Sequence, residues 1–163
     1  MTISRFSGLL LLLLASCRGT DPASEPKQLG LDFCRAVQVN AEPGAEALMS
    51  PALQAAVARL RSVDAAFRKA NPGEKPPLGD GLRLVSFPDG LESCVPTVET
   101  PMRIDLAYAP KGDPAHGWHD RLLLARGPGG RLVISDIVYN QNDAQRFSAW
   151  LADKDRGDRG GDL

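Results

Sequence analysis

The stretch that decides the fold is WHDRLLLARGPGGRLVISDIVY, residues 118–139. Two apolar runs, 118–126 and 131–139, flank the turn Gly127-Pro128-Gly129-Gly130. Two such runs joined by a short glycine-rich turn are typical of a β-hairpin. Both runs contain adjacent apolar residues, which indicates strands that are apolar on both faces. We therefore expect two central strands that are covered on each side.

Upstream of this hairpin, the sequence predicts the rest of an antiparallel sheet. Residues 102–108 alternate between large apolar and polar or small side chains, which is the period of a half-buried strand. Residues 91–99 are a second candidate, and Pro96 places that strand at an edge because proline cannot donate a ladder hydrogen bond. Residues 82–87 follow a loop rich in proline and glycine and are expected to form a further strand.

Helices are expected before and after the strands. Ser50 is a suitable N-cap for a helix over 51–69, whose first residue is a proline and whose apolar residues form one stripe. A shorter helix is expected over 29–40, and a last one is expected to be capped by Asp143. This order predicts an α+β domain in which N-terminal helices pack on one face of a curved antiparallel sheet.

The N-terminus has the features of a secretory signal peptide. Arg5 precedes six consecutive leucines, and the small residues Ala15 and Ser16 precede Cys17. The apolar run is shorter than the ~20 residues that a membrane-spanning helix needs. The tetrad Leu14-Ala15-Ser16-Cys17 resembles the bacterial lipobox, in which a signal peptidase cuts before a lipid-modified cysteine. The resemblance implies that Cys17 becomes the first residue and carries acyl chains such as palmitate.

These features divide the chain into four parts. Residues 1–16 are the expected lipoprotein signal peptide, and 17–28 are a flexible tether of mixed polar residues. Residues 29–152 are a single α+β domain, and 153–163 are a disordered tail rich in charge and glycine.

The cysteines and the charge agree with an envelope location. Of the three cysteines, acylation of Cys17 would leave Cys34 and Cys94 as a pair. In an oxidising compartment such a pair can form a disulfide, and two separate buried thiols are the alternative. The formal net charge of −1 argues against nucleic-acid binding and against polybasic adhesion to anionic lipid.

Residues 129–139 resemble the penultimate strand of nuclear-transport-factor-2-like domains, in which a glycine turn precedes the pattern Ile-x-Asp-Ile. Together with Leu48-Met49-Ser50-Pro51-Ala52-Leu53, they resemble a group of bacterial lipoproteins of unknown function. The resemblance covers roughly residues 29–152 and implies a cone-shaped α+β fold, although Leu132 stands where tryptophan is frequent. It implies a scaffold and no particular reaction, because such folds support many functions.

Asp136 is the main pocket candidate because it interrupts the apolar strand 132–138, where it is expected to share a face with Leu132, Ile134 and Val138. A buried carboxylate in a cone could act as a general base with a raised pKa. In the structural alternative, Asp136 accepts a backbone hydrogen bond or pairs with Arg103 or Arg121. Tyr139, like Tyr108, would either line that pocket or pack at the rim of the sheet.

His116 and His119 are the only histidines, and Asp113 lies just before them. Histidines three residues apart could bind a metal on a helix. Pro114 and Gly117 instead predict a loop that enters a strand, where residues three apart point to opposite faces. We therefore expect no metal site and no cofactor.

The sequence thus predicts an envelope-anchored periplasmic lipoprotein that acts as a non-catalytic binding or protein-interaction module. Arg18, not aspartate, follows Cys17, which in the lipoproteins that the chain resembles permits export to the outer membrane. The partner would be an envelope protein, a secreted toxin that is neutralised, or a small apolar ligand. The alternative is an envelope isomerase or hydrolase that uses Asp136 or the His116/His119 loop.

Overall fold

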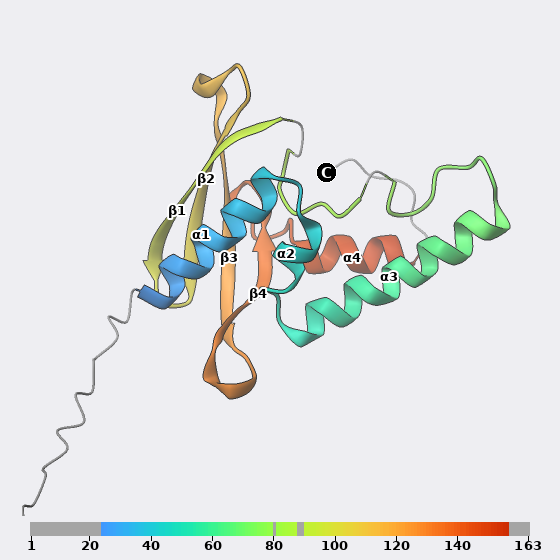
Figure 1. The fold of residues 1–163 in the computed structure, drawn as a ribbon, viewed down its shortest axis with the longest axis horizontal. Coiled ribbons are helices and arrows are strands. Elements are labelled where there is room, and N and C mark those ends of the chain that lie inside the picture. The colour runs from blue at the N-terminus through green and yellow to red at the C-terminus, as the bar shows by residue number, and fades with distance from the viewer. Residues whose placement is uncertain (1–23, 80, 88–89, 157–163) are drawn as a thin grey trace, which may run out of the picture.

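A computed structural model describes residues 24–79, 81–87 and 90–156. Within these residues, three helices precede the sheet and one follows it (Figure 1). The helices are α1 (Ser24–Gln38), α2 (Glu42–Glu46), α3 (Pro51–Ala70) and α4 (Phe147–Asp155). The strands are β1 (Leu91–Thr100), β2 (Arg103–Pro110), β3 (Trp118–Arg126) and β4 (Leu132–Val138). Short 3₁₀ turns are η1 (Pro114–His116), η2 (Pro128–Gly130) and η3 (Tyr139–Gln141).

The sheet has the order β1-β2-β3-β4, and each strand is antiparallel to its neighbours. The α+β class and the 118–139 hairpin are thereby confirmed, with β3 and β4 as the two arms. The expectation that both arms are central was wrong, because β4 lies at the edge of the sheet. Short bridges from Met49 and Arg146 to β4 cover its free side, so all of β4 except Ser135 is buried.

The strands before the hairpin follow the predicted pattern in two cases out of three. β1 contains Pro96 and lies at an edge, and β2 alternates between buried and more exposed residues. The strand expected at 82–87 was wrong, because this segment is irregular although Leu82, Leu84 and Val85 are buried.

Side chains from elsewhere explain how that irregular segment is buried. Its backbone polar groups bond to Glu42, Tyr139 and Asp120 instead of to a neighbouring strand. A buried segment without ladder partners can persist when side chains satisfy its N–H and C=O groups.

Two domain boundaries also differ from the prediction. The tether was expected to extend to residue 28, but α1 begins at Ser24, with an acidic residue and a proline in its first turn. Both residue types favour a helix N-terminus, although they are also common in linkers. At the other end, α4 continues through Asp155, so the expected tail is helical at its start. Residues 1–23 and 157–163, including Cys17, lie outside the described residues.

The long helix forms as its capping residues predict. The hydroxyl of Ser50 accepts a hydrogen bond from the N–H of Leu53 at 3.4 Å, and Pro51 occupies the first turn. By contrast, the cap predicted at Asp143 was wrong, because α4 begins after Arg146 without a side-chain cap of its own.

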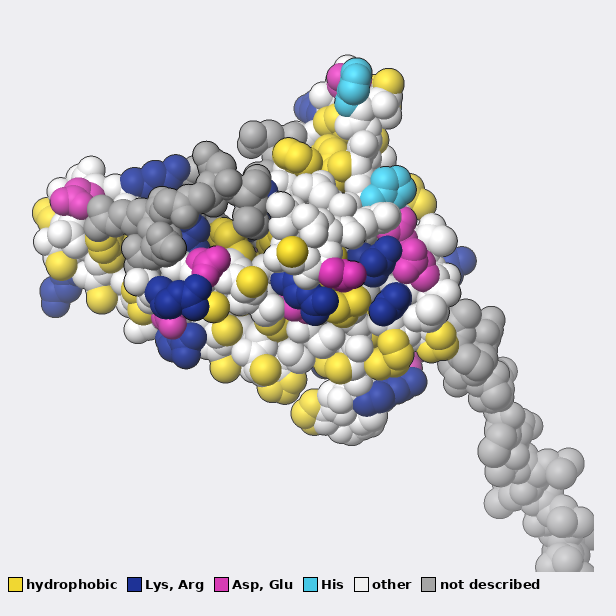
Figure 2. Space-filling model, turned by 180° about the vertical axis from the view of Figure 1, so that it is seen from behind, with side chains coloured by type: hydrophobic (Ala, Val, Ile, Leu, Met, Phe, Trp, Pro, Cys, Tyr) yellow, Lys and Arg dark blue, Asp and Glu magenta, His cyan; other side chains and the backbone are white. Residues whose placement is uncertain are grey.

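One helix covers the first half of the sheet and two cover the second. α1 crosses in front of β1 and β2, and α3 packs beside α4 and β4 (Figure 1). Figure 2, the view from behind, shows charged and polar side chains among hydrophobic ones on the far side of the molecule. The largest fully buried side chains include Phe33, Leu60, Ile104, Leu122, Ile137 and Phe147.

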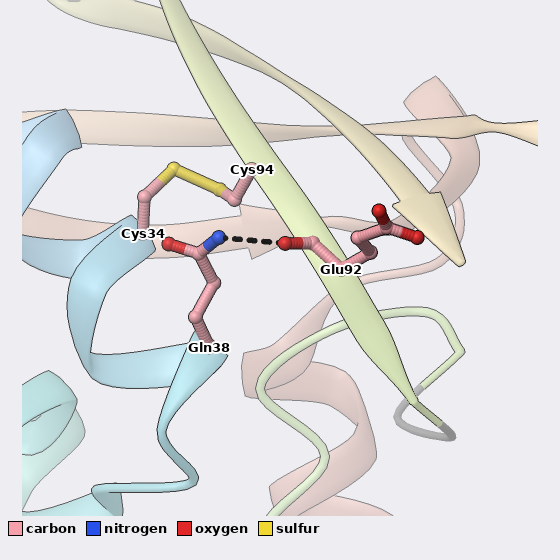
Figure 3. The surroundings of a disulfide bond; sticks show 4 residues. All are labelled: Cys34, Gln38, Glu92 and Cys94. Carbon is pink, nitrogen blue, oxygen red and sulfur yellow. Dashed lines mark hydrogen bonds between the residues drawn. A yellow bond between two sulfur atoms is a disulfide. The ribbon is translucent and has the colours of Figure 1, made fainter. Parts of the chain in front are cut away.

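A disulfide between Cys34 and Cys94 joins α1 to β1 (Figure 3). Its cysteines are 60 residues apart in the chain. One turn further along α1, Gln38 Nε2 donates to the backbone oxygen of Glu92 at 3.2 Å. The helix is thus fastened to the edge strand at two successive turns.

Candidate functional site

Asp120, on β3, has a fully buried side chain. Its Oδ2 accepts a hydrogen bond from the backbone N–H of Ser86 at 2.9 Å. Its Oδ1 accepts from the backbone N–H of Asn140 at 2.9 Å and from the Ser86 hydroxyl. One carboxylate thus holds the irregular segment 82–87 and the turn η3 against the sheet.

Burial raises the pKa of the Asp120 carboxyl above the usual range of aspartate. The hydrogen bonds from Ser86 and Asn140 and the positive charge of Arg83 act in the opposite direction and only partly offset it. A carboxyl that combines burial, a raised pKa and several donors is typical of functional sites, although structural networks also produce this combination.

Two tyrosines lie beside this carboxylate. The Tyr139 hydroxyl donates to the backbone oxygen of Arg83, and the Arg83 guanidinium lies 5.3 Å from the centre of the Tyr139 ring. Tyr108 is 3% exposed, and its hydroxyl has no hydrogen-bond partner among the described residues. Burial and the charge of Asp120 raise the pKa of Tyr108, so this hydroxyl keeps its proton and remains a donor.

Three aromatic rings in contact extend from this buried region to the surface. Trp118 lies opposite Tyr108 in the β2–β3 register, with ring centres 5.3 Å apart. Phe87 contacts Trp118 edge-on with ring centres 5.4 Å apart, and Phe87 is 53% exposed. The Nε1 of Trp118 is buried and, like the Tyr108 hydroxyl, has no partner in the described part of the chain.

We call Phe87, Tyr108, Trp118 and Asp120 the aromatic–carboxylate site. Its exposed ring offers apolar contact area, and its two unpartnered groups are hydrogen-bond donors. Aromatic residues with a polar end are common anchors at binding surfaces. The chemistry that fits the exposed part of this site is an apolar group in contact with the Phe87 ring.

Asp136 has the structural role considered in the sequence analysis. Its Oδ1 accepts from the backbone N–H groups of Ile137 and Ser148, and its Oδ2 accepts from the Ser148 hydroxyl at 2.6 Å. Ser148 lies in the first turn of α4, so Asp136 supplies from β4 the acceptor that the helix lacks at its own N-cap.

The expectation that Asp136 shares a face with Leu132 and Ile134 was wrong, although it does share one with Val138. An irregularity in the β3–β4 register pairs Leu123 with Asp136 and Leu124 with Ile134. Adjacent residues of β3 point to opposite faces, so Asp136 does not share a face with Ile134. An extra residue in one strand cannot be recognised from alternation alone.

The arginines proposed as partners of Asp136 lie elsewhere. Arg121 forms an ion pair with Glu99 at 3.2 Å, and Arg103 is exposed at the start of β2. Tyr139 is buried, as a residue that lines a pocket would be, but its hydroxyl donates a hydrogen bond to the backbone oxygen of Arg83. The alternative that Tyr108 and Tyr139 pack at the rim of the sheet was wrong, because both belong to the core.

The two histidines bind different carboxylates. His116 Nδ1 lies 2.7 Å from Asp113, and His119 Nδ1 lies 2.9 Å from Asp105, whose other oxygen accepts from Gln141. Within the described ranges, no three His, Cys, Asp or Glu side chains gather as metal ligands.

The sequence analysis missed Asp120 although a signal for it exists. Trp118, Asp120, Leu122 and Leu124 recur with a period of two, which puts the carboxylate on the same face as the core residues. The adjacent leucines at 122–124 conceal that alternation, because they indicate a strand that is apolar on both faces. Ser86 and Asn140 carry no local signal, because only the tertiary fold brings them to Asp120.

No protein-family model matches the chain, and no curated protein or solved structure shows detectable similarity to it. No helix in the described part of the chain is long and apolar enough to cross a membrane.

Proposed function

We propose that this chain is a lipoprotein of a bacterial cell envelope, anchored through acyl chains on Cys17 and exposed to the periplasm. The observation that carries the proposal is the Cys34–Cys94 disulfide, which leaves Cys17 as the one remaining cysteine of the sequence. Structural disulfides persist mainly in oxidising compartments. The position of Cys17 directly after Leu-Ala-Ser fits the lipobox pattern, and Arg18 favours the outer membrane.

We also propose that the domain is a nuclear-transport-factor-2-like cone. The turn η2 followed by β4 and the start of α3 at Ser50 and Pro51 support this assignment. The four-stranded antiparallel sheet with helices on one side is the coarser architecture on which it rests.

The role that we propose for the domain is non-catalytic binding, with the aromatic–carboxylate site as the contact surface. The carboxylate oxygens of Asp136 and Asp120 accept hydrogen bonds from other parts of the fold. The histidines lie in two separate carboxylate pairs. An isomerase or hydrolase would need a base that is free to take a proton from substrate, and the binding role does not.

Metabolic labelling with palmitate tests the anchor. We expect incorporation into the wild-type chain and none into Cys17→Ser. The matched control is Cys34→Ser/Cys94→Ser, which removes two thiols but retains Cys17 and is expected to keep the label. Equal labelling of wild type and Cys17→Ser would overturn the proposal.

Binding of 1-anilinonaphthalene-8-sulfonate, an apolar probe with acceptor oxygens, tests the site. We expect Phe87→Ala to weaken probe binding several-fold, because Phe87 supplies the exposed ring. The matched control is Val39→Ala, which shortens another exposed apolar side chain that lies just after α1. Equal binding by the two variants would exclude Phe87 as part of the binding surface.

A further inference from the structure

The start of α1 lies close in sequence to the proposed anchor. Six residues, 18–23, separate Cys17 from Ser24. A chain extends at most ~3.6 Å per residue, so Cys17 and Ser24 can be no more than about 25 Å apart. If Cys17 is acylated, the end of the domain that carries Ser24 must therefore stay near the bilayer.

Three segments meet at that end of the domain. Glu25, in the first turn of α1, forms an ion pair with Arg126 at 2.7 Å and accepts a hydrogen bond from the N–H of Leu132 at 2.7 Å. These contacts place the β3–β4 hairpin beside the start of α1. Met102, in the β1–β2 turn, accepts a hydrogen bond from the N–H of Leu124 on β3 at 3.0 Å. Figure 1 shows the β1–β2 turn beside the first turn of α1 and the β3–β4 hairpin projecting at the same end of the sheet.

Basic side chains predominate on this surface. We define the anchor-side surface by the residues around those three segments: Glu25, Lys27, Glu99, Met102, Arg103, Arg126 and Arg131. It contains four basic residues and two acidic ones. Both acidic residues lie in ion pairs, Glu25 with Arg126 and Glu99 with Arg121. Lys27, Arg103 and Arg131 are exposed.

The anchor-side surface is therefore basic, although the whole chain has a net charge of −1. A near-neutral total says nothing about how charge is distributed, and here the fold collects arginines from β2, β3 and the hairpin turn. Met102 adds an apolar side chain that is 39% exposed. Figure 2 shows basic and hydrophobic side chains together on the hairpin that protrudes near the start of the domain.

We propose that the anchor-side surface docks on anionic phospholipid headgroups of the bilayer that holds the Cys17 anchor, an inference that rests on the proposed function. Lys and Arg close to an anionic leaflet are attracted to it, and the attraction falls off within a Debye length. The tether can extend further than a Debye length, which is about 8 Å at physiological ionic strength, but it is short enough to let this surface reach the leaflet. The acyl chains attach the protein, and the basic surface sets its orientation.

This orientation directs the aromatic–carboxylate site away from the membrane. β3 runs from Trp118, within that site, to Arg126, on the anchor-side surface. Nine strand residues span roughly 26 Å at about 3.3 Å per residue. The site would thus be presented to the periplasm at the far end of the sheet, where a soluble partner or ligand can reach it.

Hydrogen exchange of the mature, lipidated protein in vesicles tests the docking. The vesicles contain phosphatidylcholine alone or phosphatidylcholine with phosphatidylglycerol, and mass spectrometry of the same sample records the acylation state. We expect the turns around Met102 and Gly129 to exchange about tenfold more slowly in the anionic vesicles, because each basic contact adds to the attraction. High salt should remove the difference.

Two charge-reversal variants give the matched comparison. Arg103→Glu/Arg131→Glu should abolish the protection. Lys69→Glu/Lys111→Glu makes the same change in net charge at exposed positions outside the anchor-side surface and should retain it. Acylated protein whose turns exchange equally in both vesicles would overturn the docking and leave the anchor intact. Unacylated protein would overturn the anchor and the docking together.

Discussion

The carboxylate of Asp120 accepts hydrogen bonds from both the backbone N–H and the hydroxyl of Ser86, 34 residues earlier in the chain. This pair fastens an irregular segment to the middle of the sheet. Because Ser86 precedes Phe87 directly, the same contact positions the exposed ring over Trp118. The position of the candidate binding surface therefore depends on the buried carboxylate.

Asp120→Asn should destabilise the fold by about 1–3 kcal/mol. An amide has one acceptor oxygen, whereas the Asp120 carboxylate accepts backbone N–H groups on both oxygens, from Ser86 and from Asn140. One buried N–H is therefore left without a partner. Urea unfolding measures the loss. Asp113→Asn, at an exposed carboxylate, is the control and should stay within about 0.5 kcal/mol of wild type.

The same residue should give a distinct dependence of stability on pH. Because burial raises the pKa of Asp120, the folded state retains this proton to higher pH than the unfolded state does. Its contribution to stability is therefore fully present below the unfolded pKa and is lost as pH rises through the folded pKa.

Unfolding free energies of wild type and Asp120→Asn, measured from about pH 3 to about pH 8, isolate this contribution because asparagine does not titrate. The advantage of wild type over the variant should shrink as pH rises across the window and then become constant. An advantage that grows with pH would show that the carboxylate form is favoured by folding, contrary to the raised pKa.

Removing the disulfide should cost about 4 kcal/mol, the loop-closure entropy of a link across 60 residues. Cys34→Ser/Cys94→Ser is compared with wild type by urea unfolding with and without a reductant. Reductant should lower the stability of wild type and leave that of the double variant unchanged. Cys17→Ser is the control and should unfold like wild type, since Cys17 precedes the described domain.

Elements with local signals could be predicted from the sequence. α3 has a serine cap, a proline in the first turn and one apolar stripe, and β2 has strict alternation, so each is determined within its own residues. The edge position of β4 was missed because it depends on which distant segments cover that edge. Those segments, at Met49 and Arg146, pair with it through isolated bridges that have no sequence pattern.

The candidate site was harder to predict for the same reason. Asp120 could be placed on the core face by alternation, but its partners Ser86 and Asn140 come from segments without regular secondary structure. Asn140 also adopts φ 49°, in the left-handed region that asparagine tolerates. Many asparagines adopt other conformations, so the residue type alone does not predict this one.

Gly30→Ala should destabilise the fold by about 1–3 kcal/mol, because it overpacks the contact between α1 and the sheet. A Cβ at position 30 would lie 2.7 Å from the Cβ of Pro96 and 3.2 Å from Ile104, and neither strand residue can move freely. Urea unfolding measures this loss in the free energy of unfolding. Gly44→Ala is the matched control, since its new Cβ would have only ordinary contacts, the nearest at 3.5 Å from Ala36. A helical glycine replaced without a clash is expected to be neutral or stabilising, so equal stability of the two variants would show that α1 can shift away from β1 despite the Cys34–Cys94 link.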